Sequence, residues 1–113
     1  MMNNTVILVT NDGMGQADVP LQHTLIAKYF DLLLANNDLP NAICFYTEGV
    51  KLAVEGSPVL AQLAALEQKG VRLVMCSTCL NYFGLSDKVK VGIVGGMGDI
   101  LEAQVKAEKV ITL

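Results

Sequence analysis

The chain alternates short apolar runs with longer stretches in which apolar residues recur every three or four positions. The short runs are rich in β-branched residues and end at turn-forming residues, a pattern typical of strands buried on both faces. Such runs predict five strands, at residues 5–10, 41–46, 71–75, 89–94 and 110–111. The fourth is less apolar than the first two, because it contains Lys90 and Gly92.

The longer stretches predict helices between these strands. Helical spacing and turn signals place four helices and one short helical turn at residues 20–35, 57–70, 76–83, 99–107 and, for the turn, 48–55. Asp18 is a candidate N-cap for the first helix and Asp99 for the last. Because strands alternate with helices, we expect one domain over residues 1–113, a three-layer α/β/α sandwich with a mostly parallel five-stranded sheet.

Composition indicates which kinds of partner this domain can bind. Apolar residues make up 52% of the chain and charged residues only 17%, and 8 Lys and Arg against 11 Asp and Glu give a net charge of −3. An acidic chain without a basic run argues against nucleic-acid binding, because it would repel phosphate backbones. A surface short of charge favours contact between copies, so we expect a homo-oligomer.

The N-terminal sequence and the cysteine count point to a cytoplasmic protein. No basic leader precedes an apolar segment, and no run approaches the roughly 18 apolar residues of a membrane span, so no membrane contact is expected. Three cysteines cannot all pair within one chain, which favours a reducing compartment.

In a parallel sheet, ligands bind beyond the carboxyl ends of the strands. That rule selects the loops at residues 11–18, 47–49, 76–78 and 95–99. The candidate pocket residues in these loops are Asn11, Gly13, Met14, Gly15, Glu48, Gly49, Ser77, Thr78, Gly95, Gly96 and Met97. The glycines would let the backbone approach a small ligand closely. Neither a dinucleotide fingerprint nor a P-loop is complete, so nucleotide binding is not predicted.

Cys76 is the strongest candidate for chemistry. It follows the third predicted strand directly and lies at or near the N-cap of the next helix, where the helix dipole and free N–H groups favour a thiolate. A thiolate is a nucleophile, so we assign Cys76 the catalytic role. The alternative is a buried, inert cysteine at the end of a strand.

Cys79 is a second candidate thiol, three residues after Cys76. The pair could bind zinc, but a structural site needs four ligands and the chain offers only Cys44 and His23 in addition. The pair could also be a redox dithiol. We favour a third interpretation, in which Cys76 reacts and Cys79 packs inward. We expect no structural metal and no cofactor, with Cys44 in the core and His23 near the surface rather than acting as a base.

Three motifs resemble the DsrE/DsrF-like sulfur-relay family. They are the Asn-Asp-Gly-Met-Gly loop at 11–15, Glu-Gly-Val-Lys-Leu at 48–52 and Cys-Ser-Thr-Cys-Leu-Asn-Tyr-Phe-Gly-Leu at 76–85. The last is most similar to the DsrE-like domain of YedF-type proteins, which are associated with selenium metabolism. The resemblance implies an α/β/α fold, trimers or hexamers, and a persulfide on Cys76, since several members carry one about eight residues before a glycine, here Gly84.

The resemblance therefore predicts a small sulfurtransferase-like protein that carries sulfane sulfur on Cys76. YedF-type proteins have a separate N-terminal carrier domain that this chain lacks, so a TusA-like sulfur carrier or a cysteine desulfurase is an expected partner. Ala17, Gln22 and Ser77 depart from the YedF-like pattern, which often has glycine there. Two other functions stay open: a non-catalytic oligomeric protein that binds a small ligand or partner, and a Cys76/Cys79 dithiol oxidoreductase.

Overall fold

Five parallel strands form one sheet at the centre of the computed structural model, which describes residues 4–113. The strands are β1 (Thr5–Val9), β2 (Ala42–Phe45), β3 (Arg72–Cys76), β4 (Ile93–Gly95) and β5 (Lys109–Thr112), in the spatial order β4-β3-β2-β1-β5. Every residue of β1 and β2 is buried, which explains why these segments are continuous apolar runs. The predicted α/β fold with a parallel five-stranded sheet is confirmed.

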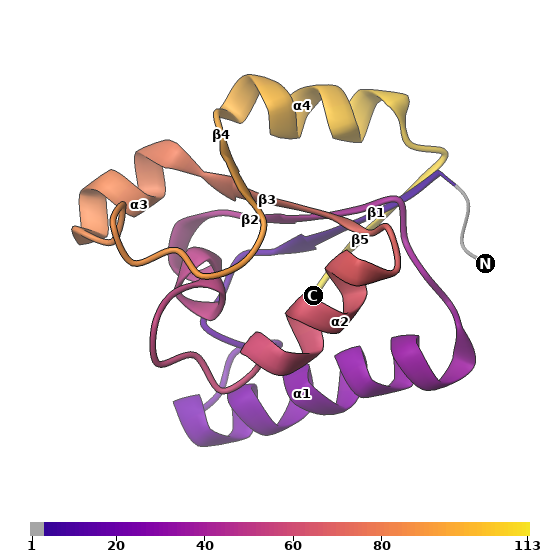
Figure 1. The fold of residues 1–113 in the computed structure, drawn as a ribbon, viewed down its shortest axis with the longest axis horizontal. Coiled ribbons are helices and arrows are strands. Elements are labelled where there is room, and N and C mark those ends of the chain that lie inside the picture. Colours follow the sequence, from indigo (N-terminus) through magenta and orange to yellow (C-terminus); the bar gives the residue numbers. More distant parts are fainter. Residues whose placement is uncertain (1–3) are drawn as a thin grey trace.

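Helices cover both faces of this sheet. Figure 1 shows α1 (Val19–Asn36) and α2 (Leu60–Gln68) on one face and α4 (Met97–Lys106) on the other. The short α3 (Ser77–Phe83) extends from the end of β3 and packs against the 3-10 helix η1 (Thr47–Ala53). Within residues 4–113, no helix is both long and apolar enough to cross a membrane.

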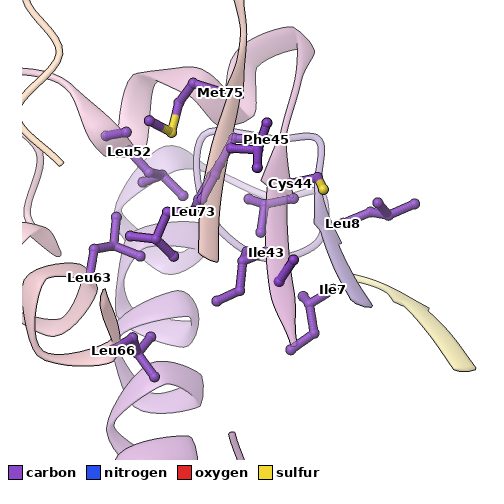
Figure 2. Packing of buried hydrophobic residues seen from close by; sticks show 14 of the residues in the cluster. Ile7, Leu8, Ile43, Cys44, Phe45, Leu52, Leu63, Leu66, Leu73 and Met75 are labelled. Atoms are coloured by element: carbon purple, nitrogen blue, oxygen red, sulfur yellow. The ribbon is translucent and has the colours of Figure 1, made fainter. Parts of the chain in front are cut away.

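The core lies between the sheet and the helices. Ile26, Phe30 and Leu33 of α1 are buried at helical spacing, and Leu63 and Leu66 of α2 join the same cluster. Figure 2 shows the two α2 leucines among the buried side chains of β1, β2 and β3. Burying a side chain of this kind contributes about 1.5–3 kcal/mol, so this cluster fixes the sheet that carries the loops described below.

The fourth strand differs from the prediction. It is a three-residue edge strand, Ile93–Gly95, whereas the sequence predicted residues 89–94. Gly92 has φ +76°, which ends any extended run before Ile93. Val89 instead forms an isolated antiparallel bridge with Val54, next to η1.

The last helix also begins earlier than predicted. Gly96 is its N-cap and Asp99 is its third residue, so the assignment of Asp99 as the cap is wrong. The Asp99 carboxylate reaches back and accepts a hydrogen bond from the Gly96 N–H at 2.9 Å. This contact satisfies a main-chain donor at the helix start, as a capping side chain would, but from inside the helix. Asp18 does precede α1 as its N-cap, through its carbonyl oxygen, which accepts bonds from Leu21 and Gln22.

Candidate functional site

Cys76 lies at the junction of a strand and a helix. It is the last residue of β3, where it pairs with Gly95 of β4, and it is also the N-cap of α3. It is therefore at the carboxyl edge of the sheet, where the sequence placed it. Its exposed fraction is only 1%.

Cys79 lies one helical turn further on and is only partly buried. The Thr47 N–H donates a hydrogen bond to its Sγ atom at 3.0 Å. Burial raises the pKa of the Cys79 thiol, and the hydrogen bond and charge of Cys76 raise it further, while the Thr47 N–H acts in the opposite direction. Cys79 packs against the hydrophobic core, in line with the prediction, but it is the more exposed of the two thiols.

Thr47 aims this N–H through an unusual backbone conformation. Its φ is +48°, a value that β-branched residues rarely adopt. Its hydroxyl oxygen lies within hydrogen-bonding distance of two carbonyl oxygens, those of Thr10 and Tyr46. The hydroxyl has one proton and can donate to only one of them at a time. These contacts connect the ends of β1 and β2 and hold the donor against Cys79.

Cys79 opens onto an apolar hollow of about 290 Å³. The hollow is lined by Thr47, Thr78, Cys79, Tyr82 and Phe83. The Tyr82 ring meets the Phe83 ring edge to face, with centroids 5.3 Å apart, and Tyr82 as a whole is 85% exposed. A group that enters this hollow meets the Cys79 sulfur between aromatic walls.

Phe83 also borders a second, more polar pocket of about 380 Å³. There His23 Nε2 lies 2.9 Å from Asp12 Oδ1, and the Lys51 ammonium lies 4.7 Å from the centre of the Phe83 ring. His23 is partly buried, in line with its predicted position. The buried Gln22 fixes this region, because its side-chain amide bonds the Asp12 carbonyl and the Ala17 N–H.

Most of the predicted pocket residues shape loops rather than the hollow beside Cys79. Asn11 bonds the Gly15 carbonyl through its side chain, and the Gly13 N–H bonds the Asn11 carbonyl, so this loop closes on itself. Gly49 is buried in η1 against the Val9 carbonyl, which leaves no room for a side chain. The Met14 N–H donates to the Gln22 carbonyl, and Glu48 lies exposed on η1. The remaining candidates lie at the ends of elements: Ser77 begins α3, Gly95 ends β4, Gly96 is the N-cap of α4 and Met97 begins that helix.

Sequence reasoning did not single out three residues of the hollow. Tyr82 and Phe83 follow Cys79 by three and four positions, so helical spacing alone places them beside it. Thr47 lies in the predicted loop at residues 47–49, but no sequence pattern predicts that a threonine will adopt a positive φ. Its role is visible only once η1 and α3 are packed together.

The third cysteine is a core residue. Cys44 lies in β2 with an exposed fraction of 0%, as predicted. Burial raises the pKa of its thiol to about 11, against an opposing effect of the Arg72 charge. Nowhere in residues 4–113 do three or more His, Cys, Asp or Glu side chains gather in a way that could hold a metal ion.

Comparison with known proteins identifies relatives of the whole chain. The sequence model of the DsrE/DsrF-like family matches residues 4–113. A protein of unknown function from Methanobacterium thermoautotrophicum has a similar structure, with a TM-score of 0.71 and 21% identity over 96% of this chain and 97% of that one. The ychN protein from E. coli gives a TM-score of 0.71 and 18% identity, over 99% of this chain and 100% of its own.

A protein of unknown function from Bacteroides thetaiotaomicron is also similar, with a TM-score of 0.68 and 16% identity over 97% of this chain and 95% of that one. At these identities the similarity shows the shared fold alone. No curated protein sequence matches this chain.

Proposed function

This chain belongs to the DsrE/DsrF-like family, which is associated with sulfur relay, and we propose on that basis that it carries sulfane sulfur as a persulfide on Cys76. One observation carries the proposal: Cys76 and Cys79 lie together at the carboxyl edge of the sheet, and Cys79 faces an open apolar hollow. A carrier needs a thiol that a donor can reach and a place where the bound sulfur is shielded. The pair supplies both.

The chemistry requires little beyond the two thiols. A thiolate attacks the outer sulfur of a donor persulfide, the donor S–S bond breaks, and the donor leaves as a thiol once it has taken up the proton. The product is a protein persulfide. On Cys76, whose exposed fraction is 1%, that persulfide is protected from water and from unrelated thiols.

The proposal includes partners and a cellular setting. A cytoplasmic TusA-like sulfur carrier or a cysteine desulfurase is the expected donor or acceptor. The aromatic edge of the hollow supports this, because Tyr82 is 85% exposed and offers a contact to a docking protein. The Cys-Ser-Thr-Cys-Leu-Asn-Tyr motif at 76–82 is the basis for a YedF-like role in selenium metabolism.

We also propose that copies of the chain associate, as trimers or hexamers. Large apolar side chains on α4 and on the two edge strands, β4 and β5, support this, because they are exposed to water. They are Ile93, Val94, Met97, Leu101, Val105 and Val110. Contact between copies would remove them from water.

A dithiol oxidoreductase is the second candidate function. The position of Cys76 at the N-cap of α3 and of Cys79 at its third residue favours it, because neighbouring thiols can be oxidised to a disulfide. That function predicts reversible oxidation of the pair without uptake of sulfur.

Intact-mass measurement separates the two functions. After incubation with a cysteine desulfurase and cysteine, the wild-type chain should gain the mass of one sulfur atom, and so should the Cys44→Ala control. The Cys76→Ser/Cys79→Ser double variant should gain none. A wild-type mass that stays unchanged, together with reversible loss of two hydrogens under mild oxidation, would replace the carrier with the oxidoreductase.

A further inference from the structure

We infer that Cys79 is the receiving thiol of the pair: a donor persulfide passes its outer sulfur to Cys79 first, and Cys76 then takes it from Cys79. The inference rests on the proposed function and adds the order in which the two thiols act. It gives Cys79 an active role, where the sequence suggested a passive one. Three structural observations lead to it.

The first observation is access. An attacking sulfur must approach in line with the donor S–S bond, and Cys76 has an exposed fraction of only 1%. Cys79 is partly exposed and contributes to the wall of the apolar hollow. A donor that enters the hollow between Thr78 and Phe83 therefore reaches the Cys79 sulfur without any movement of β3.

The second observation is the hydrogen bond from Thr47. Its N–H points at Cys79 Sγ from 3.0 Å, held there by the contacts of the Thr47 hydroxyl with the ends of β1 and β2. This donor stabilises negative charge on Cys79 when the thiolate forms. It does so again when Cys79 becomes the leaving group, and a better-stabilised thiolate leaves faster.

The third observation is the proximity of the two cysteines: Cys76 is the N-cap of α3 and Cys79 is the third residue of that helix, two positions whose side chains meet at the start of a helix. In the first step, the Cys79 thiolate bonds the outer sulfur of the donor R–S–SH, the donor S–S bond breaks, and R–SH forms with the proton that Cys79 gave up. In the second step, Cys76 attacks the outer sulfur of the Cys79 persulfide, and the S–S bond of Cys79 breaks. The proton of Cys76 ends on Cys79, and no oxidant or reductant is consumed.

Time-resolved loading tests this order. The wild-type chain is mixed with glutathione persulfide, quenched by alkylation at increasing times, digested, and mapped by tandem mass spectrometry. The persulfide should appear first on Cys79 and later on Cys76. Cys79→Ser should load at least about tenfold more slowly than wild type, because the accessible nucleophile is gone. Cys76→Ala should load no more slowly than wild type, because the receiving thiol is still present, and it should keep its sulfur on Cys79.

The Cys44→Ala variant is the matched control and should behave as the wild type. The inference is overturned if Cys79→Ser loads as fast as wild type, or if the earliest wild-type persulfide is already on Cys76. It is equally overturned if loaded wild type releases sulfide and forms a Cys76–Cys79 disulfide, because Cys76 would then attack the inner sulfur. If none of the proteins takes up sulfur, the proposed function itself fails, a result distinct from a wrong order.

Discussion

At the residue scale, Thr47 links the backbone to the thiol chemistry. A positive φ at a β-branched residue costs on the order of 1–3 kcal/mol and persists only where surrounding contacts hold it. Here the contacts come from its own hydroxyl, which reaches the carbonyls of Thr10 and Tyr46. The same residue turns its N–H toward Cys79. The strained backbone of Thr47 therefore determines which hydrogen-bond donor the Cys79 thiol meets.

Thr47→Val tests this coupling, because valine keeps the shape of threonine but has no hydroxyl. The variant should lose about 1–2 kcal/mol of unfolding free energy, as expected when a carbonyl loses its hydrogen-bond donor. It should also slow alkylation of Cys79 at a fixed pH, since the N–H is no longer held in place. Urea unfolding and the rate of iodoacetamide labelling measure the two effects. Thr78→Val, at another threonine of the same hollow, is the control, and equal behaviour of the two variants would contradict the coupling.

Cys79 should react faster as the pH rises past 9.0. Its pKa lies above the ordinary thiol value of 9.0, so only a small fraction is thiolate near neutral pH, and that fraction grows about tenfold per pH unit below the pKa. Cys76→Ala removes a hydrogen bond and a charge that both raise this pKa. The pH profile of Cys79 alkylation should therefore move to lower pH in that variant. A profile that stays in place or moves upward would show that Cys76 does not act on Cys79.

The sequence was sufficient to locate Cys76 and Cys79 but not to rank their exposure. Their positions follow from the chain itself, because β3 must end near residue 76 and α3 must begin there. Exposure depends on which neighbours pack over each sulfur. For Cys79 these neighbours include Thr47 of η1, which is 32 residues away in sequence, so the pattern around the cysteines holds no information about that contact.

At the scale of elements, η1 is placed by a close approach to β1. Gly49 lies so near the Val9 carbonyl that an added Cβ would collide with it. Val9 is held in the central sheet, so its carbonyl cannot move cheaply away from Gly49. The position of η1, and with it the Thr47 N–H, depends on this glycine.

Gly49→Ala should destabilise the chain by several kcal/mol, the range typical of a forced backbone clash. Gly98→Ala is the matched comparison, because Gly98 lies in the first turn of α4 and an added Cβ there meets no atom within 4 Å. That variant should gain about half a kcal/mol, as alanine is the better helix former. Thermal or urea unfolding of the two variants measures the difference. Similar stability of the two variants would mean that the backbone of η1 can shift at Gly49 to make room for a Cβ atom.

Element boundaries were predicted well for the buried strands and poorly for the starts of β4 and α4. The buried strands β1 and β2 end within a residue of the apolar runs that predicted them. The start of β4 depends on Gly92, whose positive φ ends the extended run. The start of α4 depends on the Asp99 side chain, which reaches back three residues. The conformation of one glycine and the hydrogen bond of one side chain set these two boundaries, and a hydropathy pattern predicts neither.

At the scale of the molecule, the two faces of the sheet are unequally covered. Figure 1 shows α1 and α2 on one face and α4 on the other. Met97, Leu101 and Val105 recur every four residues along α4 and are 49%, 59% and 75% exposed. Residues at this spacing share one side of a helix, so an apolar stripe on α4 faces outward. Ile93 and Val94 of the edge strand β4 are exposed as well.

This stripe gives the proposed homo-oligomer a sharp test. A negative charge within an apolar contact costs several kcal/mol if copies meet there, and almost nothing if the residue faces water. Leu101→Glu should therefore shift the protein toward the 12.1 kDa single chain in sedimentation velocity. Leu32→Glu on α1 is the matched control, because Leu32 is also 59% exposed but lies on the opposite face. It should leave the sedimentation of the wild type unchanged. A wild-type chain that sediments as a monomer at micromolar concentration, or equal effects of the two substitutions, would remove α4 as the contact between copies.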